Sequence, residues 1–177
     1  MPSPGAGGAR VAGSERISGG EKTNAYREIS RDAFGALDYL SAQPYVDSNR
    51  IAVIGFSLGA NTINSFLIHQ PKRPDRTFAA AVAVYGRCHD LPRHPRPQTP
   101  LMEIAGELDG PHVEPCRRVA SMVEVHVLPG AHHAWDSPSA HGKMGQAGEL
   151  MLYDAASTER SRELVRDFLA RHLKEKD

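Results

Sequence analysis

The segment of residues 51–60 reads Ile51-Ala52-Val53-Ile54-Gly55-Phe56-Ser57-Leu58-Gly59-Ala60. Its first half is apolar and rich in β-branched residues, which predicts a buried strand, and the pattern from Asn61 to His69 predicts a helix. Between them lies Gly-x-Ser-x-Gly, in which the serine occupies a sharp strand-to-helix turn and the two glycines leave room for the crossing backbone. Ser57 is therefore expected to project its hydroxyl from the end of a sheet, as a nucleophile. An ordinary glycine-rich turn is the alternative, but it does not explain the flanking strand and helix.

The composition is that of one globular domain. The chain has 177 residues, 40% of them hydrophobic and 24% charged, which suffices to bury a core. Because 21 Lys and Arg balance 21 Asp and Glu, we expect no nucleic-acid partner. No apolar run approaches the roughly 20 residues of a membrane helix, and the N-terminus lacks the pattern of a secretory signal. We therefore expect a cytoplasmic protein with no membrane partner.

The chain divides into an arm and a domain. Residues 1–23 are rich in Gly, Ser and Ala, cannot bury enough apolar surface to become ordered, and are expected to form a flexible arm. Residues 24–177 are expected to form one domain in which strands alternate with helices, an arrangement typical of a parallel sheet covered on both faces. The prediction is an α/β fold with three α/β/α layers. The expected helices are Asn24–Ala42, Asn61–His69, Val113–Met122 and Ser157–Leu173, and the expected strands are Ile51–Phe56, Phe78–Tyr85, Leu101–Ala105 and Val123–Leu128.

Acidic and histidine residues follow the third and fourth strands. Functional side chains gather beyond the carboxyl ends of parallel strands, so these residues are expected to lie near Ser57. A serine nucleophile needs a histidine to accept its proton, and the histidine needs a carboxylate to orient it. Asp109 is placed to be that carboxylate, with Glu107 as the reserve candidate. The spacing alone does not decide between His132 and His133 as the base.

A metal site is the competing interpretation of the same loop. Residues His132, His133, Asp136 and His141 lie close together in sequence, and such side chains can hold zinc. The chain has neither the His-x-x-x-His nor the Cys-x-x-Cys spacing that would support this, so no metal is expected. The two cysteines, Cys88 and Cys116, follow strand ends and are either two reduced thiols or one disulfide.

Three motifs together resemble the dienelactone hydrolase family of α/β-hydrolases. They are residues 43–59, with Gln43-Pro44-Tyr45-Val46-Asp47 leading to the serine motif, then Gly106-Glu107-Leu108-Asp109, and finally Pro129-Gly130-Ala131-His132-His133-Ala134-Trp135-Asp136. The likeness runs from about Tyr26 to the C-terminus.

The resemblance implies a catalytic triad and a reaction. It implies Ser57 as nucleophile, Asp109 as acid and His133 as base, since the family's histidine precedes a small residue and an aromatic one, here Ala134-Trp135. It also implies hydrolysis of small carboxylic esters or lactones through an acyl-enzyme, without a cofactor. The family's namesakes carry cysteine at the nucleophile position, so the serine here argues against dienelactone itself as substrate.

Nothing before Asn24 resembles the loop that completes the oxyanion hole in this fold. The fold usually has strands before the nucleophile strand, and a loop among them supplies the second donor of the oxyanion hole. The backbone N–H of Leu58 is expected to be the first donor, and losing its partner typically lowers turnover a hundredfold to a thousandfold. We therefore expect the C-terminal part of an α/β-hydrolase fold with weak activity, and we favour an incomplete product of a longer gene. The alternatives are a sheet completed by another chain and a reduced fold whose N-terminal arm covers the sheet edge.

Two further expectations concern the surface. Without the preceding strands, the nucleophile strand exposes an apolar edge, through which the chain could form a homodimer. The alternative to an enzyme is an inactive remnant that pairs with another chain. For substrate binding, Arg87 could hold a carboxylate as a bidentate fork, although a surface role is the commoner outcome. Trp135 is the other candidate, although packing beside the histidine loop is the more plausible role.

Overall fold

The computed structural model describes residues 19–65, 67, 77–93, 95–145 and 148–174. At its centre lies a four-stranded sheet with strand order β1-β2-β3-β4. The strands are β1 (Ala52–Phe56), β2 (Ala80–Val84), β3 (Leu101–Gly106) and β4 (Glu124–Leu128). Each neighbouring pair is parallel, which confirms the predicted parallel sheet.

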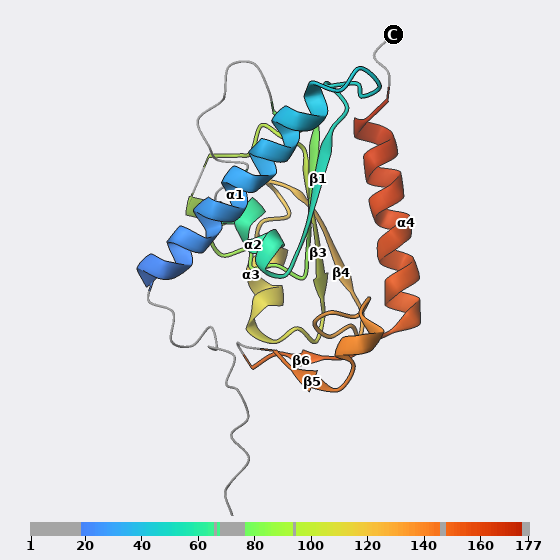
Figure 1. The fold of residues 1–177 in the computed structure, drawn as a ribbon. Coiled ribbons are helices and arrows are strands. Elements are labelled where there is room, and N and C mark those ends of the chain that lie inside the picture. The colour runs from blue at the N-terminus through green and yellow to red at the C-terminus, as the bar shows by residue number, and fades with distance from the viewer. Residues whose placement is uncertain (1–18, 66, 68–76, 94, 146–147, 175–177) are drawn as a thin grey trace, which may run out of the picture.

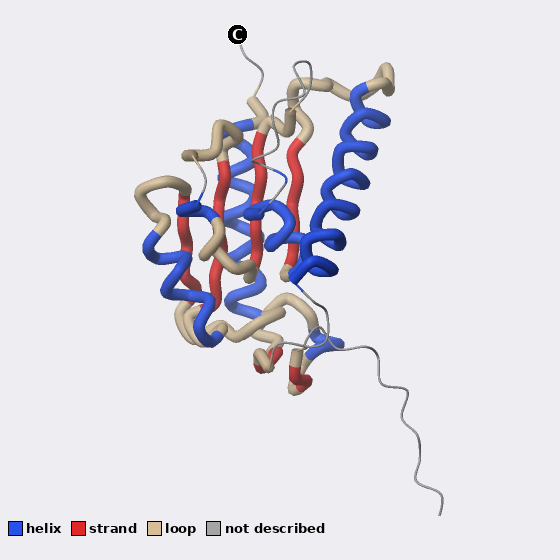
Figure 2. The backbone as a smooth tube through the Cα atoms, turned by 90° about the vertical axis from the view of Figure 1, so that its left-hand side faces the viewer, coloured by secondary structure: helices blue, strands red, loops and turns tan. Residues whose placement is uncertain are grey.

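Helices cover both faces of this sheet, as Figures 1 and 2 show. On one face lie α1 (Gly19–Ser41), α2 (Leu58–Ser65) and α3 (Val113–Arg118), and on the other lies α4 (Ala155–His172). Two hydrophobic clusters fill the spaces between the layers, one centred on Ile63 and Val119 and the other on Ile104 and Phe168. Every residue of β2 is buried, because this strand has neighbours on both sides and helices on both faces. The three-layer α/β fold is confirmed.

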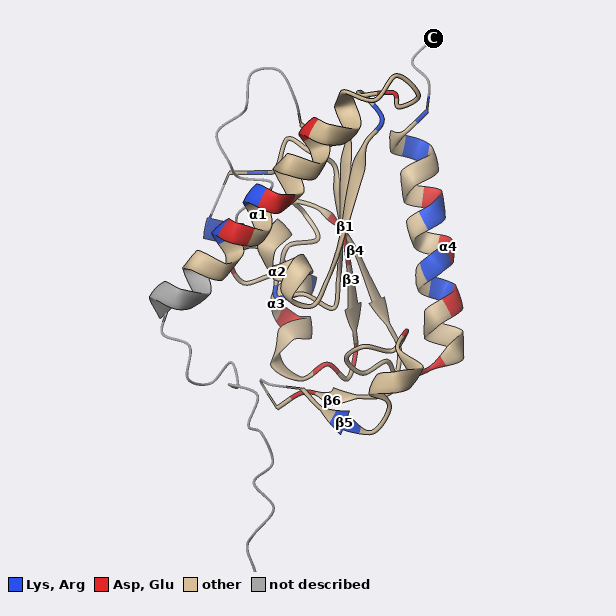
Figure 3. Ribbon diagram, in the orientation of Figure 1, with Lys and Arg blue, Asp and Glu red and all other residues tan. Residues whose placement is uncertain are grey.

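Helix α4 has a side-chain cap at its start and one face packed on the core. Asp154 caps α4 by accepting a hydrogen bond from the Ser157 backbone N–H at 2.6 Å. Leu164 and Phe168 of α4 point into the core, while charges of both signs lie along its outer side (Figure 3). No helix in the described residues is long and apolar enough to cross a membrane.

Several boundaries differ from expectation. Helix α1 already begins at Gly19, and residues 1–18 of the expected arm lie outside the described residues. Helix α2 begins at Leu58 and is described to Ser65; residues 66, 68 and 69 of the expected helix lie outside the described residues. The sequence patterns did not predict the hairpin of β5 (Lys143–Met144) and β6 (Leu150–Met151), which lies beyond the carboxyl ends of the sheet strands (Figure 1). They also did not predict three short 3-10 helices, η3 (Leu91–Arg93), η4 (Gly110–His112) and η5 (Pro138–Ala140).

Strand β1 forms an edge of the sheet. Among the described residues it pairs with β2 alone. Two of its apolar side chains on the α4 side, Ile54 and Phe56, are 39% and 48% exposed. The expected exposed apolar edge is therefore present in the described part of the chain.

Candidate active site

Ser57 lies in the turn between β1 and α2. Its φ angle is +49°, the left-handed conformation that a sharp strand-to-helix turn imposes on its central residue. A Cβ added at Gly55 would lie 2.5 Å from the backbone carbon of Gly59, so only glycine fits at position 55. At Gly59 an added Cβ would meet nothing within 4 Å in the described structure, so the expectation that both glycines are sterically required is wrong for Gly59.

The three predicted triad residues lie in one hydrogen-bonded line. The Oγ atom of Ser57 is 3.0 Å from Nε2 of His133. On the other side of the ring, Nδ1 of His133 is 2.9 and 3.1 Å from the two carboxylate oxygens of Asp109. A carboxylate only accepts hydrogen bonds, so Nδ1 carries the hydrogen and Nε2 is free to accept the Ser57 proton. Of the two neighbouring histidines, His133 is the one hydrogen-bonded to both Ser57 and Asp109.

Backbone contacts hold the acid and histidine loops together. Leu108 N–H donates to the carbonyl of Ala131 at 2.9 Å, and Glu107 N–H donates to that of Leu128 at 3.0 Å. A Cβ at Gly106 would lie 2.5 Å from the Ala131 carbonyl oxygen, so the close approach requires glycine there. The carboxylate of Glu107, the reserve candidate for the acid, accepts a hydrogen bond from Gly130 N–H at 2.9 Å. It therefore bonds to the backbone of the histidine loop.

An aromatic ring, that of Tyr85, packs against the imidazole of His133. The ring of Tyr85 lies 4.8 Å from that of His133 and 4.9 Å from that of Trp135. The hydroxyl of Tyr85 donates to Asp136 at 2.9 Å. Burial, and then the charge of Asp136, raises the pKa of Tyr85 far above its usual 10, so Tyr85 remains a donor at neutral pH. Sequence reasoning missed Tyr85, although its place at the end of β2, just before Gly86, was an available signal.

Trp135 is fully buried, and its indole N–H donates to Ser161 of α4 at 3.2 Å. No part of its ring is open to a substrate, which corrects the expectation that it lines the substrate site. It instead anchors the histidine loop to α4.

Left-handed φ angles occur at three non-glycine residues of the described chain, Ser57, Tyr85 and Ala134, with values of 49°, 42° and 51°. All three are in or beside the residues that form the site.

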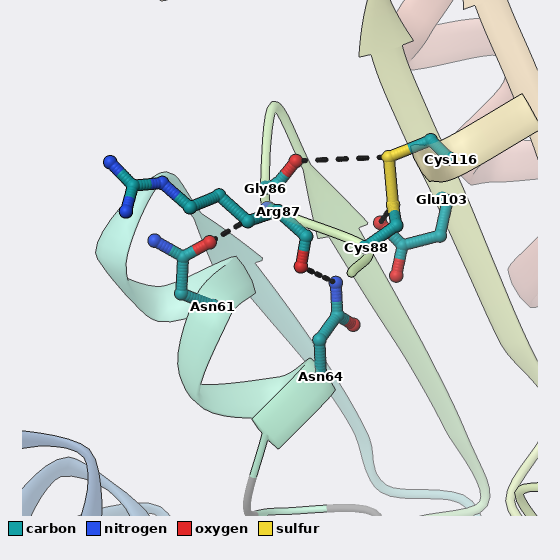
Figure 4. The surroundings of a disulfide bond; sticks show 7 residues. All are labelled: Asn61, Asn64, Gly86, Arg87, Cys88, Glu103 and Cys116. Carbon is teal, nitrogen blue, oxygen red and sulfur yellow. Dashed lines mark hydrogen bonds between the residues drawn. A yellow bond between two sulfur atoms is a disulfide. The ribbon is translucent and has the colours of Figure 1, made fainter. Parts of the chain in front are cut away.

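Arg87 lies at the carboxyl end of β2, held by its backbone. Its N–H donates to Asn61 at 2.7 Å, and its carbonyl accepts from Asn64 at 3.2 Å, so both contacts come from the helix that follows the nucleophile (Figure 4). Burial, and secondarily the positive charge of Arg87, lowers the pKa of His112. Asp109, His133 and Glu149 also act on the pKa of His112 through their charges.

The two cysteines form a disulfide between the segment after β2 and helix α3. Both are fully buried, and Figure 4 shows Glu103 of β3 beside them. Sγ of Cys88 lies 3.4 Å from Oε2 of Glu103. A disulfide sulfur carries no hydrogen, so a hydrogen bond here requires a protonated Glu103. Burial supports this by raising the pKa of Glu103 well above 4.5, while a hydrogen bond from Asn64 has a smaller, opposite effect.

The described residues contain one cluster of three side chains that could hold a metal ion, and it is Cys88, Cys116 and Glu103. Its two sulfurs are bonded to each other, so they are not available as thiolate ligands. The histidine cluster weighed from the sequence is not gathered in this way: His133 and Asp136 instead bond to Asp109 and Tyr85. A hollow of about 360 Å³ lies at the amino ends of β3 and β4 and contains none of the triad residues.

Comparison with known proteins identifies relatives of this chain. A family model described as the dienelactone hydrolase family matches residues 8–173. A search of curated proteins found no match. Among solved structures, a dienelactone hydrolase-like promiscuous phosphotriesterase from metagenomic libraries is 26% identical, with a TM-score of 0.60, over 86% of this chain and 64% of that chain.

Two further structures support the fold. A dienelactone hydrolase from Anabaena variabilis is 18% identical, with a TM-score of 0.62, over 84% of this chain and 62% of that one. A ferulic acid esterase from Streptomyces cinnamoneus is 22% identical, with a TM-score of 0.60, over 86% of this chain and 49% of that one. The chain thus spans less than two thirds of the length of each of these three structures.

Proposed function

Since this chain belongs to the dienelactone hydrolase family, we propose that it is a serine hydrolase that cleaves small carboxylic esters or lactones. The observation that supports the proposal best is the 3.0 Å approach of Ser57 Oγ to His133 Nε2, with Asp109 on the opposite nitrogen of the ring. A serine in this arrangement can lose its proton as it attacks, which an isolated serine cannot do at neutral pH.

The proposed reaction has two steps. In the first, Ser57 Oγ attacks the ester carbonyl carbon while His133 Nε2 takes its proton, and the backbone N–H of Leu58 donates to the developing oxyanion. His133 then gives the proton to the leaving alcohol, which leaves an acyl group on Ser57. In the second step, water attacks the acyl carbon and the acid is released. Asp109 stabilises the imidazolium that forms in both steps, and no cofactor is needed for this chemistry.

Arg87 is proposed to bind the acid portion of the substrate. Its backbone is clamped by Asn61 and Asn64 of the helix that follows Ser57. Its charge lowers the pKa of His112, on which the charges of His133 and Asp109 also act. A guanidinium in this place suits a second carboxylate on the substrate, because it can bind both oxygens at once. This predicts a preference for half-esters of dicarboxylic acids over neutral esters of the same length.

The alternative is an inactive remnant that keeps the triad and pairs with another chain. The exposed apolar edge at Ile54 and Phe56 is the observation that favours it. The enzyme is preferred because the nucleophile, the base and the acid are aligned by hydrogen bonds.

A fluorophosphonate probe and p-nitrophenyl acetate test the proposal. We expect the probe to label the protein once, at Ser57, and Ser57→Ala to abolish both the labelling and the hydrolysis. Ser139→Ala, a change of the same kind at an exposed position of the 3-10 helix η5, is the matched control and should behave like the wild type. Hydrolysis that survives Ser57→Ala would mean that surface nucleophiles cleave the ester, and would refute the proposal.

A further inference from the structure

Glu149 faces the same imidazole nitrogen as Ser57. Its Oε1 atom lies 3.8 Å from Nε2 of His133, on the side of the ring away from Asp109. The Glu149 side chain is 16% exposed and that of His133 is 8% exposed, so the pair is largely shielded from water. The triad therefore has a second carboxylate at the nitrogen that exchanges protons with the substrate.

The backbone holds Glu149 in this place. The segment after Glu149 pairs with His133 on both sides: His133 N–H donates to the carbonyl of Leu150 at 3.2 Å, and Leu152 N–H donates to that of His133 at 3.2 Å. Across the hairpin, Gly145 N–H donates to the carbonyl of Glu149 itself at 2.7 Å. The position of this carboxylate is thus coupled directly to the position of the catalytic histidine.

Gly145 also makes room for the Glu149 side chain. A Cβ added at Gly145 would overlap the Glu149 side chain, with Oε1 at only 2.6 Å. The carboxyl group of Glu149 therefore lies over position 145, and any larger residue there would displace it.

The separation suits a shared water molecule. At 3.8 Å, Oε1 and Nε2 are too far apart for a direct hydrogen bond but close enough for one oxygen to bond to both. A water that gives one hydrogen to Nε2 and the other to Oε1 has its lone pairs directed away from both groups. Such a water would be both oriented and activated for attack on a group attached to Ser57.

We propose that Glu149 is the positioning residue for the hydrolytic water of the second step. This inference rests on the proposed hydrolase function. The water oxygen forms a bond to the acyl carbon while one of its protons passes to Nε2 of His133, and Glu149 accepts a hydrogen bond from its other hydrogen. The bond between the acyl carbon and Ser57 Oγ then breaks, Oγ recovers the proton from Nε2, and the carboxylic acid leaves. The first step uses no water, so it does not depend on Glu149.

The two steps can be timed separately with p-nitrophenyl trimethylacetate, whose acyl-enzyme is hydrolysed slowly. Release of nitrophenolate in a stopped-flow instrument gives the acylation rate. Quenching followed by intact-protein mass spectrometry gives the decay of acylated protein. For Glu149→Ala we expect deacylation to slow about tenfold or more and acylation to stay within about twofold of wild type. Gly145→Ala, which keeps the carboxylate but displaces it, should slow deacylation in the same way.

Glu159→Gln is the matched control, because Glu159 lies on the outer side of α4 and pairs only with the exposed Arg162 in the described structure. It should leave both rates unchanged. Unchanged deacylation in Glu149→Ala, or equal slowing of both steps, would overturn the inference. Failure of the proposed function would look different, because wild-type protein would then show no burst that depends on Ser57.

Discussion

Both carboxylate oxygens of Asp109 lie within 3.1 Å of Nδ1 of His133, and both side chains are buried. Such a pair fixes the imidazole in one orientation and one tautomer. The loop that carries Asp109 and the loop that carries His133 approach closely at Gly106 and Ala131. The distance between the two side chains is therefore fixed by backbone packing as well as by their hydrogen bonds.

The first prediction concerns this pair. Asp109→Asn keeps the size of the side chain but presents an amide to Nδ1, which favours the wrong tautomer of His133. We expect kcat for p-nitrophenyl acetate to fall roughly a thousandfold or more, with an unchanged thermal midpoint. Glu107→Gln, the corresponding change on the neighbouring acid, should have little effect on kcat. Full activity in Asp109→Asn would assign the acid role elsewhere.

The second prediction separates the two glycines of the serine motif. A Cβ at Gly55 would lie 2.5 and 2.6 Å from the backbone carbon and oxygen of Gly59, which cannot move aside. Gly55→Ala should therefore lower the free energy of unfolding by about 2 kcal/mol or more. Gly59→Ala meets open space inside a helix and should be neutral or stabilising by up to about 1 kcal/mol. Urea denaturation of the two variants measures both changes, and equal effects would contradict the geometry.

The third prediction is a pH dependence of stability from Glu103. Burial raises the folded-state pKa of Glu103 well above the 4.5 of an exposed glutamate. The folded protein therefore keeps a proton that the unfolded chain releases, so the stabilising contribution is complete below pH 4.5 and is lost as the pH rises toward the folded pKa. Glu103→Gln cannot release a proton and removes this dependence.

The measurement is the unfolding free energy of wild type and Glu103→Gln at pH 4, 6 and 8. We expect the stability of the variant, relative to wild type, to increase steadily across that range. The exposed Glu114→Gln serves as the control and should show no such trend. A difference between Glu103→Gln and wild type that is constant with pH would show that Glu103 is not held in its protonated form.

The fourth prediction concerns the disulfide. Cys88 and Cys116 are 28 residues apart, and closing a loop of that length restricts the unfolded chain by roughly 3–4 kcal/mol. The double substitution Cys88→Ala and Cys116→Ala should lower the unfolding free energy by about that amount. Wild-type protein unfolded in a reducing agent should match the variant, whereas a reducing agent should not affect the variant itself. Equal stability of oxidised wild type and variant would contradict the prediction.

The fifth prediction tests self-association through the β1 edge. An edge strand with exposed apolar side chains pairs readily with another chain, and a charge on it opposes that pairing. We propose that the chain forms a homodimer here, and expect Ile54→Lys to weaken it in sedimentation equilibrium. Tyr45→Lys, at a side chain that is 78% exposed in the loop after α1, is the control. A wild-type protein that stays monomeric at high concentration would refute the proposal.

Hydrophobic patterns within single segments of the sequence predicted the strands and helices of the fold well. The β-branched run before Ser57 and the apolar periodicity of Leu164 and Phe168 each depend on one element and its burial, so the four parallel strands and their covering helices could be anticipated. The roles expected for Gly59 and Trp135 failed because they depend on what neighbouring elements place around them. Space at Gly59 and complete burial of Trp135 follow from packing that a single sequence does not encode locally.

The candidate site was predicted only in part for a similar reason. The motifs indicated Ser57, Asp109 and His133, but adjacent histidines in a loop have no periodicity to separate them. The contacts of Glu149 come from a hairpin of two-residue strands, too short for any alternating pattern. Whether Cys88 and Cys116 form a disulfide or remain two thiols likewise depends on how closely α3 approaches the end of β2, which the sequence alone does not show.

The left-handed residues Ser57, Tyr85 and Ala134 set activity against thermostability in this molecule. Each departs from relaxed backbone geometry at a cost of order 1–3 kcal/mol, and the rigid sheet beneath them offsets it. Of the three, only Ala134 has no side-chain role in the site, because Ser57 is the proposed nucleophile and the buried ring of Tyr85 packs on His133 and Trp135. Directed evolution for heat resistance would therefore relax Ala134 first, since glycine there relieves the strain. Such a protein would survive higher temperatures but would hold the neighbouring His133 less firmly, so a variant that is both durable and active has to gain its stability elsewhere.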